Sequence, residues 1–128
     1  MINYLLRTTF ILAAILIALS RLNSLYAQED SYLSTMEIGG FAEVKNNNQA
    51  AAKDRAVKDA IRRAVEETVE STLSPEVLLN NYSWISNIYS NSEEYIHSYR
   101  FLSESFDEET NIYSVTLRIT LYPSYIKS

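Results

Sequence analysis

The sequence predicts a small α+β domain: a three-stranded, largely antiparallel sheet covered by one long helix and one or two short helices. Three observations support this class. Residues 112–122 alternate apolar and polar side chains without a fault, as a half-buried strand does. A second strand-like run, residues 95–106, precedes them, and residues 54–69 (DRAVKDAIRRAVEETV) repeat apolar residues at helical spacing. The expected order is strand, long helix, short helix, strand, strand.

The first strand is expected at Met36–Val44, where apolar and polar residues alternate on either side of a glycine pair. Gly39 and Gly40 inside a strand indicate a bulge or a close backbone approach. We favour the simple bulge over an approach made by a ligand.

The long helix is expected at about Gln49–Leu73, with Asn48 as its N-cap. At 100° per residue one half of the helix is apolar, and the other half carries nearly all the charges. The apolar half holds Val57, Ala60, Ile61, Ala64, Val65, Thr68 and Val69. Charges four residues apart are expected to pair, as Asp54 with Lys58, Arg55 with Asp59, Asp59 with Arg63, Arg62 with Glu66 and Arg63 with Glu67. The charged half is therefore a solvated surface and not a nucleic-acid-binding patch.

Alanine at positions 50, 51, 52, 56, 60 and 64 allows a neighbouring backbone to approach closely, which suits a helix lying flat on a sheet. Ser74-Pro75-Glu76 ends this helix and begins another, because serine caps, proline suits the first helical position and glutamate suits the positive helix end. The stretch NNYSWISNIYSNSEEY is consistent with a short helix or an irregular loop, and we favour the helix.

The last two strands are expected to form an antiparallel hairpin. The first, residues 95–106, is expected to place Tyr95, His97, Tyr99 and Phe101 on one side. The second places Tyr113, Val115, Leu117, Ile119 and Leu121 on one face. Five polar residues, Asp107–Asn111, connect them, a usual length for a hairpin loop.

The N-terminal residues resemble a secretory signal. Arg7 supplies a positive start, residues 10–19 are all apolar, and Leu25-Tyr26-Ala27 precedes a polar stretch. We expect a signal peptide at 1–27 cleaved near Ala27, a flexible lead-in at 28–34, one domain at 35–123 and a C-terminal tail at 124–128. A retained membrane anchor is the alternative; ten apolar residues rise roughly 15 Å as a helix, about half a bilayer core.

Composition narrows the function. The chain has no cysteine, which excludes disulfides, thiolate metal sites, a cysteine nucleophile and a lipoprotein acyl site. Removing residues 1–27 takes away two of the 11 basic residues and none of the 16 acidic ones, so the exported chain carries a net charge of −7. That charge argues against wrapping nucleic acid or lying on an anionic membrane.

Catalytic signals are weak. His97 is the only histidine, and a strand histidine between tyrosines is more often a packed or half-exposed residue than a base. With no cysteine beside it, a transition-metal site is not expected. Neighbouring carboxylates at Glu93-Glu94 and at 107–109 rarely aim at one substrate atom, and residues 107–109 lack the pattern of a dedicated calcium loop. We predict no enzyme and no cofactor.

Tyrosine and tryptophan are the remaining functional signal, since both are favoured at protein interfaces. Packing across the hairpin accounts for many of them without a partner. The candidate contact residues are Trp84, Tyr89, Tyr95, Tyr99 and Tyr122. The hairpin edge is also a candidate for strand addition.

The sequence resembles the N-terminal domain of the flagellar assembly protein T family, a periplasmic component of the basal-body ring. The resemblance rests on residues 52–69 (AKDRAVKDAIRRAVEETV), on Tyr95–Tyr99 (YIHSY) and on Tyr113–Leu117 (YSVTL), and it spans about residues 36–122. It implies a structural role without catalytic residues. Family members usually carry two further domains that this sequence lacks, which suggests an accessory subunit, an adaptor or a protein recruited to another envelope or cell-surface assembly.

The expected function is thus a non-enzymatic, exported interaction module of a Gram-negative envelope, periplasmic or secreted, in a flagellar or other surface assembly. Its expected partners are other envelope or flagellar proteins or a second copy, with no nucleic acid and no stable membrane insertion. The alternative is a small-ligand or glycan binder that uses Trp84 and the tyrosines.

Overall fold

A computed structural model describes residues 33–126 of the chain. The predicted signal peptide, its cleavage site and most of the lead-in therefore lie outside the described residues. Among the helices of residues 33–126, none combines the length and the apolar character that crossing a membrane requires.

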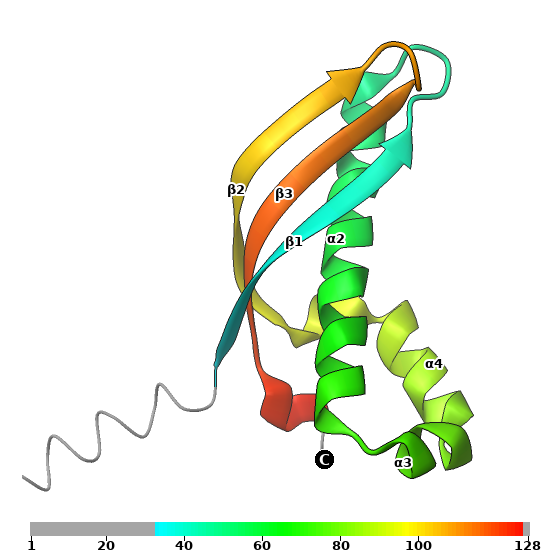
Figure 1. The fold of residues 1–128 in the computed structure, drawn as a ribbon, viewed down its shortest axis with the longest axis vertical. Coiled ribbons are helices and arrows are strands. Elements are labelled where there is room, and N and C mark those ends of the chain that lie inside the picture. Colours follow the sequence, from blue (N-terminus) through cyan, green and yellow to red (C-terminus); the bar gives the residue numbers. More distant parts are fainter. Residues whose placement is uncertain (1–32, 127–128) are drawn as a thin grey trace, which may run out of the picture. The chain divides into compact units, whose positions relative to one another are not determined.

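The described residues form the predicted α+β arrangement (Figure 1). Strand β1 (Ser34–Glu43) leads to helix α2 (Gln49–Thr72), and two short helices follow, α3 (Pro75–Asn80) and α4 (Tyr82–Ser90). A 3₁₀ helix, η2 (Ser92–Tyr95), precedes the hairpin of β2 (Ile96–Asp107) and β3 (Ile112–Leu121), and a second one, η3 (Pro123–Ile126), follows it. The sheet order is β1-β3-β2 with both pairings antiparallel, so β3 is central and β1 and β2 are edges.

The helix boundaries follow from the predicted caps. The side chain of Asn48 accepts a hydrogen bond of 3.0 Å from the backbone N–H of Ala51, and that of Ser74 accepts one of 3.4 Å from Val77. Both caps satisfy backbone donors that a first helical turn leaves free. The stretch NNYSWISNIYSNSEEY, consistent with a short helix or a loop, contains helix α4, in agreement with the favoured prediction, and ends in η2.

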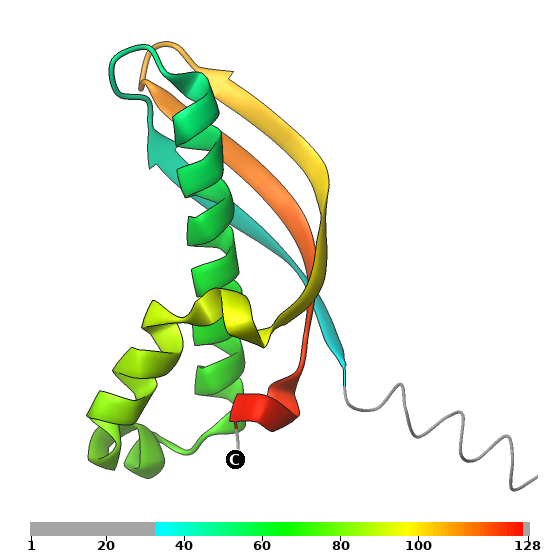
Figure 2. The same cartoon turned by 180° about the vertical axis from the view of Figure 1, so that it is seen from behind.

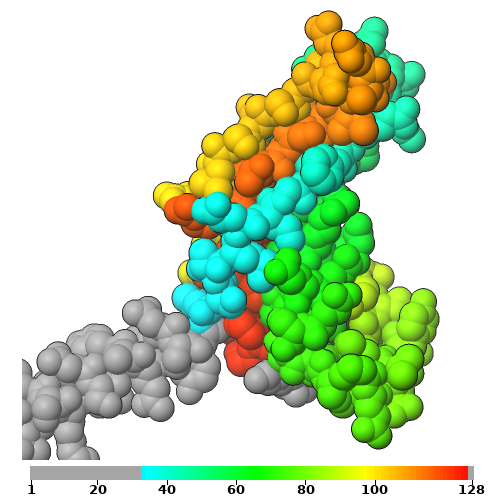
Figure 3. All heavy atoms as spheres, in the orientation of Figure 1, coloured from blue at the N-terminus to red at the C-terminus, as the bar shows by residue number. Residues whose placement is uncertain are grey.

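The core lies between α2 and one face of the sheet. Every residue of the predicted apolar half of α2 is buried, and β3 contributes Val115, Leu117, Ile119 and Leu121. Figure 2, seen from behind, shows α2 in front of the strands. The opposite, outer face of the sheet carries Ser114, Thr116, Arg118 and Thr120 of β3, and no described helix lies across it (Figure 3).

A second core cluster joins the C-terminal half of α2 to the short helices. It contains Val65, Val69, Ile85, Ile88 and Ile126. Residues 124–128 were predicted to be a tail, yet Ile126 is fully buried in this cluster. Helix α4 therefore packs beside α2, and α2 is the helix that lies on the sheet (Figure 2).

The glycine pair does not form a bulge, and this interpretation was wrong. Pairing between β1 and β3 runs without interruption from Ser34 to Glu43. Gly40 instead lies directly under α2, where an added Cβ would meet the backbone of Ala56 and Ala60 at 2.0 and 2.6 Å. The close backbone approach is made by the chain's own helix.

Two irregularities occur in β2 instead. Register shifts lie between Ile96 and Ser98 and between Phe101 and Ser103. The predicted face Tyr95, His97, Tyr99, Phe101 is therefore wrong at its start: Tyr95 belongs to η2, and Ile96 lies opposite the buried Leu121. An extra residue at each shift resets the two-residue alternation, which composition does not reveal.

Candidate functional site

The face of β2 that looks towards α2 is open to solvent. Helix α2 packs on β1 and β3 and barely touches β2. Tyr99 and Phe101 lie opposite the buried Ile119 and Leu117, on the same face of the sheet, yet they are 46% and 43% exposed. The core face of β2 is thus left largely uncovered.

A groove of about 750 Å³ lies between α2 and this strand. One wall comes from α2 and the other from β2, with Ile96, His97, Tyr99 and Phe101. The α2 wall carries Lys53, Asp54, Val57, Lys58 and Ile61. We call it the α2–β2 groove. The rings of Tyr99 and Phe101 stand edge to face, 6.1 Å between centroids, so the groove presents an aromatic wall.

An ion pair between α2 and β2 lies beside this groove. Lys53 Nζ lies 2.6 Å from a carboxylate oxygen of Glu104 and 4.7 Å from the centre of the Phe101 ring. The hydroxyl of Tyr113 donates to Glu104 at 3.1 Å. The hydrogen bond between the pair raises the pKa of Lys53 and lowers that of Glu104. Both groups are exposed, so the pair adds little stability.

The charge pairing on α2 only partly matches the prediction. Of the five expected pairs, Asp59–Arg63 and Arg62–Glu66 form, and Asp59 also binds Arg62. Arg55 instead donates to the backbone carbonyl of Glu43 at 2.7 Å. Lys58, expected to pair with Asp54, has no ion-pair partner within residues 33–126 and lines the groove.

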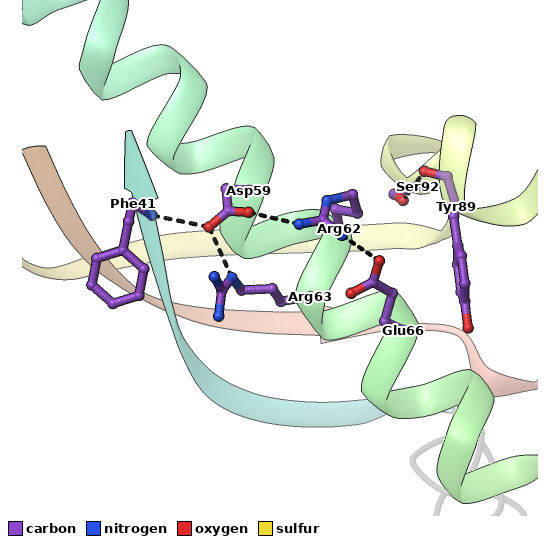
Figure 4. A network of polar contacts seen from close by, with 7 residues as sticks. All are labelled: Phe41, Asp59, Arg62, Arg63, Glu66, Tyr89 and Ser92. Carbon is purple, nitrogen blue, oxygen red and sulfur yellow. Dashed lines mark hydrogen bonds and ion pairs between the residues drawn. The ribbon is translucent and has the colours of Figure 1, made fainter. Parts of the chain in front are cut away.

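Asp59 connects α2 to the edge of β1 (Figure 4). One of its oxygens accepts the backbone N–H of Phe41 at 3.0 Å and the Arg63 Nε–H at 2.8 Å, and the other accepts from Arg62 at 2.9 Å. Burial alone would raise the pKa of Asp59, but these hydrogen bonds outweigh it and hold the pKa below its ordinary value of 3.8. Asp59 and Arg55 thus occupy outward backbone groups on the β1 edge, which blunts that edge against other strands.

The five candidate contact residues do not converge. Trp84, Tyr89 and Tyr95 are partly buried against the second core cluster. Tyr89 also lines a smaller hollow of about 430 Å³ with Arg62 and Glu93, and burial raises its pKa. The hydroxyl of Tyr122 lies 2.6 Å from the ring nitrogen Nδ1 of His97, and the Tyr122 ring packs against that of Tyr125. Tyr99 alone faces the α2–β2 groove.

Phe101, Lys53 and Lys58 were not among the candidate residues. Phe101 was placed on the same side of its strand as Tyr99, and that shared side was the available signal. Nothing in the sequence indicated that α2 would leave this side uncovered, because the lateral position of a helix on a sheet depends on packing across the whole interface.

The acidic residues of the hairpin loop have a structural role. Asp107 accepts the backbone N–H groups of Glu109 and Thr110, at 2.9 and 3.4 Å, and so stabilises the hairpin turn. Within residues 33–126 no three His, Asp or Glu side chains are grouped as a metal site would require.

No protein-family model matches this sequence, and a search of curated proteins finds no significant match.

Proposed function

We propose that this protein is a non-enzymatic, exported interaction module of the bacterial cell envelope, periplasmic or secreted, and that the α2–β2 groove is where it contacts a partner. One observation carries the proposal: Tyr99 and Phe101 remain almost half exposed although they stand on the core face of the sheet. Exposed aromatic residues beside a sheet edge are typical of surfaces that other proteins cover.

Two features of the sequence support the proposed cellular setting. Residues 1–27 resemble a secretory signal, and the resemblance to the flagellar assembly protein T family makes a basal-body or other surface assembly the first setting to examine. An accessory or adaptor role needs a binding surface and no catalytic centre.

Cell fractionation and site-specific crosslinking test the proposal together. The full chain, tagged at its C-terminus, is produced in its own host with a photoreactive phenylalanine analogue at position 99. We expect the protein in the periplasm or the medium, and a crosslink to an envelope protein. The same analogue at Lys45, an exposed position in the turn before α2, is the matched control. A cytoplasmic protein, or equal crosslinking from both positions, contradicts the proposal.

A small-ligand or glycan binder remains the second candidate. The observation that favours it is the aromatic wall of the groove, because sugar rings stack on exposed aromatic faces, and Lys53 and Lys58 stand nearby as donors. Trp84 lies elsewhere, against the second core cluster, so its fluorescence would not report on this groove. Calorimetric titration with a panel of envelope glycans tests this candidate: saturable binding that Tyr99→Ser abolishes supports it.

A further inference from the structure

Asp59 and Arg55 of α2 bind outward backbone groups of the β1 edge, whereas no described helix or strand pairs with the β2 edge. Residues across an antiparallel ladder alternate between hydrogen-bonded and non-hydrogen-bonded pairs. Phe41 donates its N–H to Asp59, outside the sheet, so the backbone groups of its partner Ser114 point to β2. Because the pattern repeats every two residues, the backbone groups of Arg118 also point to β2, where they face Arg100. The same alternation turns the N–H and C=O groups of Tyr99 and Phe101 away from the sheet.

The two register shifts bound this open edge. Pairing is regular from Ser98 to Phe101 and is interrupted on either side. The site is therefore short: it offers the outward backbone groups of Tyr99 and Phe101, with the α2–β2 groove against the core face.

A row of charges crosses the outer face at the middle of this stretch. Glu37 of β1 lies opposite Arg118 of β3, and Arg118 lies opposite Arg100 of β2. Arg118 is ion-paired with Glu37. Arg100 has no ion-pair partner within residues 33–126. The row therefore consists of one negative and two positive side chains, and it ends with Arg100 at the open edge. Like charges directly opposite each other are destabilising, and an acidic neighbour would relieve them.

We propose that Ser98–Phe101 of β2 binds an extended segment of a partner protein as a fourth strand, with an acidic side chain opposite Arg100 and apolar side chains on either side of it. This rests on the proposed function and names the partner's chemistry. The acidic residue completes the charge row on the outer face. The apolar residues stand opposite Tyr99 and Phe101 on the other face, where the α2–β2 groove receives them.

A second copy of the chain fits this edge poorly. The antiparallel self-pairing that uses both outward residues sets Tyr99 opposite Phe101 of the other copy. It therefore sets Arg100 opposite Arg100 and joins the two charge rows, so that four arginines, Arg118 and Arg100 of each copy, follow one another across the outer face. The occupant that the charges favour is a different segment with the pattern apolar–acidic–apolar.

Short peptides test the inference on the purified full chain. The probe is a dye-labelled peptide Thr-Val-Glu-Val-Thr, and its match has lysine in place of glutamate. Fluorescence anisotropy is expected to show saturable binding, with the acidic peptide bound about three- to tenfold more tightly. Arg100→Glu is expected to reverse this preference, whereas Lys45→Glu, the same charge change at a distant exposed position, leaves it intact. Equal affinity for both peptides, or no saturable binding at millimolar concentration, overturns the inference.

The backbone part of the inference is tested without changing the protein. A methyl group on the two valine amide nitrogens removes the N–H donors that an added strand requires and keeps the side chains. Loss of binding supports strand addition; unchanged binding overturns it. Sedimentation of the full chain tests the second copy: a dimer that Tyr99→Pro dissociates would make the occupant another copy and overturn the inference. If the peptides fail while crosslinking from position 99 to an envelope protein persists, only the inference fails.

Discussion

Gly40 of β1 and Ala60 of α2 meet with no room for a side chain on the strand. A Cβ at position 40 would lie 2.6 Å from the Ala60 nitrogen and 2.0 Å from the Ala56 carbonyl oxygen. Neither contact can be relieved by moving a flexible side chain, because both partners are helix backbone. The distance between α2 and β1 is therefore set at this point.

Gly40→Ala is expected to destabilise the fold by more than about 3 kcal/mol, because α2 must move away from the sheet to admit the methyl group. Gly39→Ala is the matched control: its Cβ would come no nearer than 3.4 Å, to the ring of Phe41, and the expected cost is at most about 1 kcal/mol. Urea unfolding followed by circular dichroism measures both. Similar losses would contradict the close approach of α2 at Gly40.

Enlarging the alanines of α2 tests the same interface from the other side. Ala60 and Ala64 are fully buried, so Ala60→Leu or Ala64→Leu is expected to overpack the core and cost roughly 1–3 kcal/mol. Arg62 lies on the solvated half and its side chain is 46% exposed, so its ion pairs contribute little. Arg62→Ala is expected to stay within about 0.5 kcal/mol. Equal effects in the unfolding curves would mean that the two halves of α2 are assigned wrongly.

Elements with a strong local signal could be predicted from the sequence. The caps at Asn48 and Ser74, the apolar half of α2 and the alternation of β3 each depend on residues close together in the chain. The α2–β2 groove could not be predicted this way. The groove exists because Gly40 allows α2 to pack closely on β1 and because β2 contains register shifts, and residue composition does not reveal such shifts. The candidate contact residues are tyrosines and a tryptophan, selected by residue type alone, and the fold places these aromatic residues on separate surfaces.

The uncovered side of β2 predicts a contrast between two residues that lie opposite each other in the sheet. Leu117 is fully buried, and Leu117→Ala is expected to cost about 2–5 kcal/mol. Phe101, its partner in β2, is 43% exposed, so Phe101→Ser loses mainly the ring contacts with Lys53 and Tyr99 and is expected to cost about 1 kcal/mol. Thermal or urea unfolding distinguishes them. A loss at Phe101 as large as that at Leu117 would show that Phe101 belongs to the core and is not available to a partner.

Asp59 gives the fold a dependence on pH whose sign follows from its contacts. Its pKa is lowered in the folded protein, so ionised Asp59 contributes stability that is fully present above the ordinary value of 3.8 and is lost as the pH falls through the lower folded value. Asp59→Ala removes the acceptor of Phe41 N–H and leaves Arg62 and Arg63 without this carboxylate. We expect a loss of roughly 1–3 kcal/mol near neutral pH.

That loss should shrink in acid, because protonation weakens the same hydrogen bonds in the wild type. Urea unfolding of the wild type and of Asp59→Ala between neutral pH and about pH 3 measures the gap, which is the difference between their free energies of unfolding. Glu70→Ala, at an exposed position further along α2, is the control for a lost negative charge. A gap that stays constant over this range would mean that the carboxylate does not act through its charge. A gap that narrows for Asp59→Ala, and no comparable change for Glu70→Ala, assigns the pH dependence to the contact between α2 and the β1 edge.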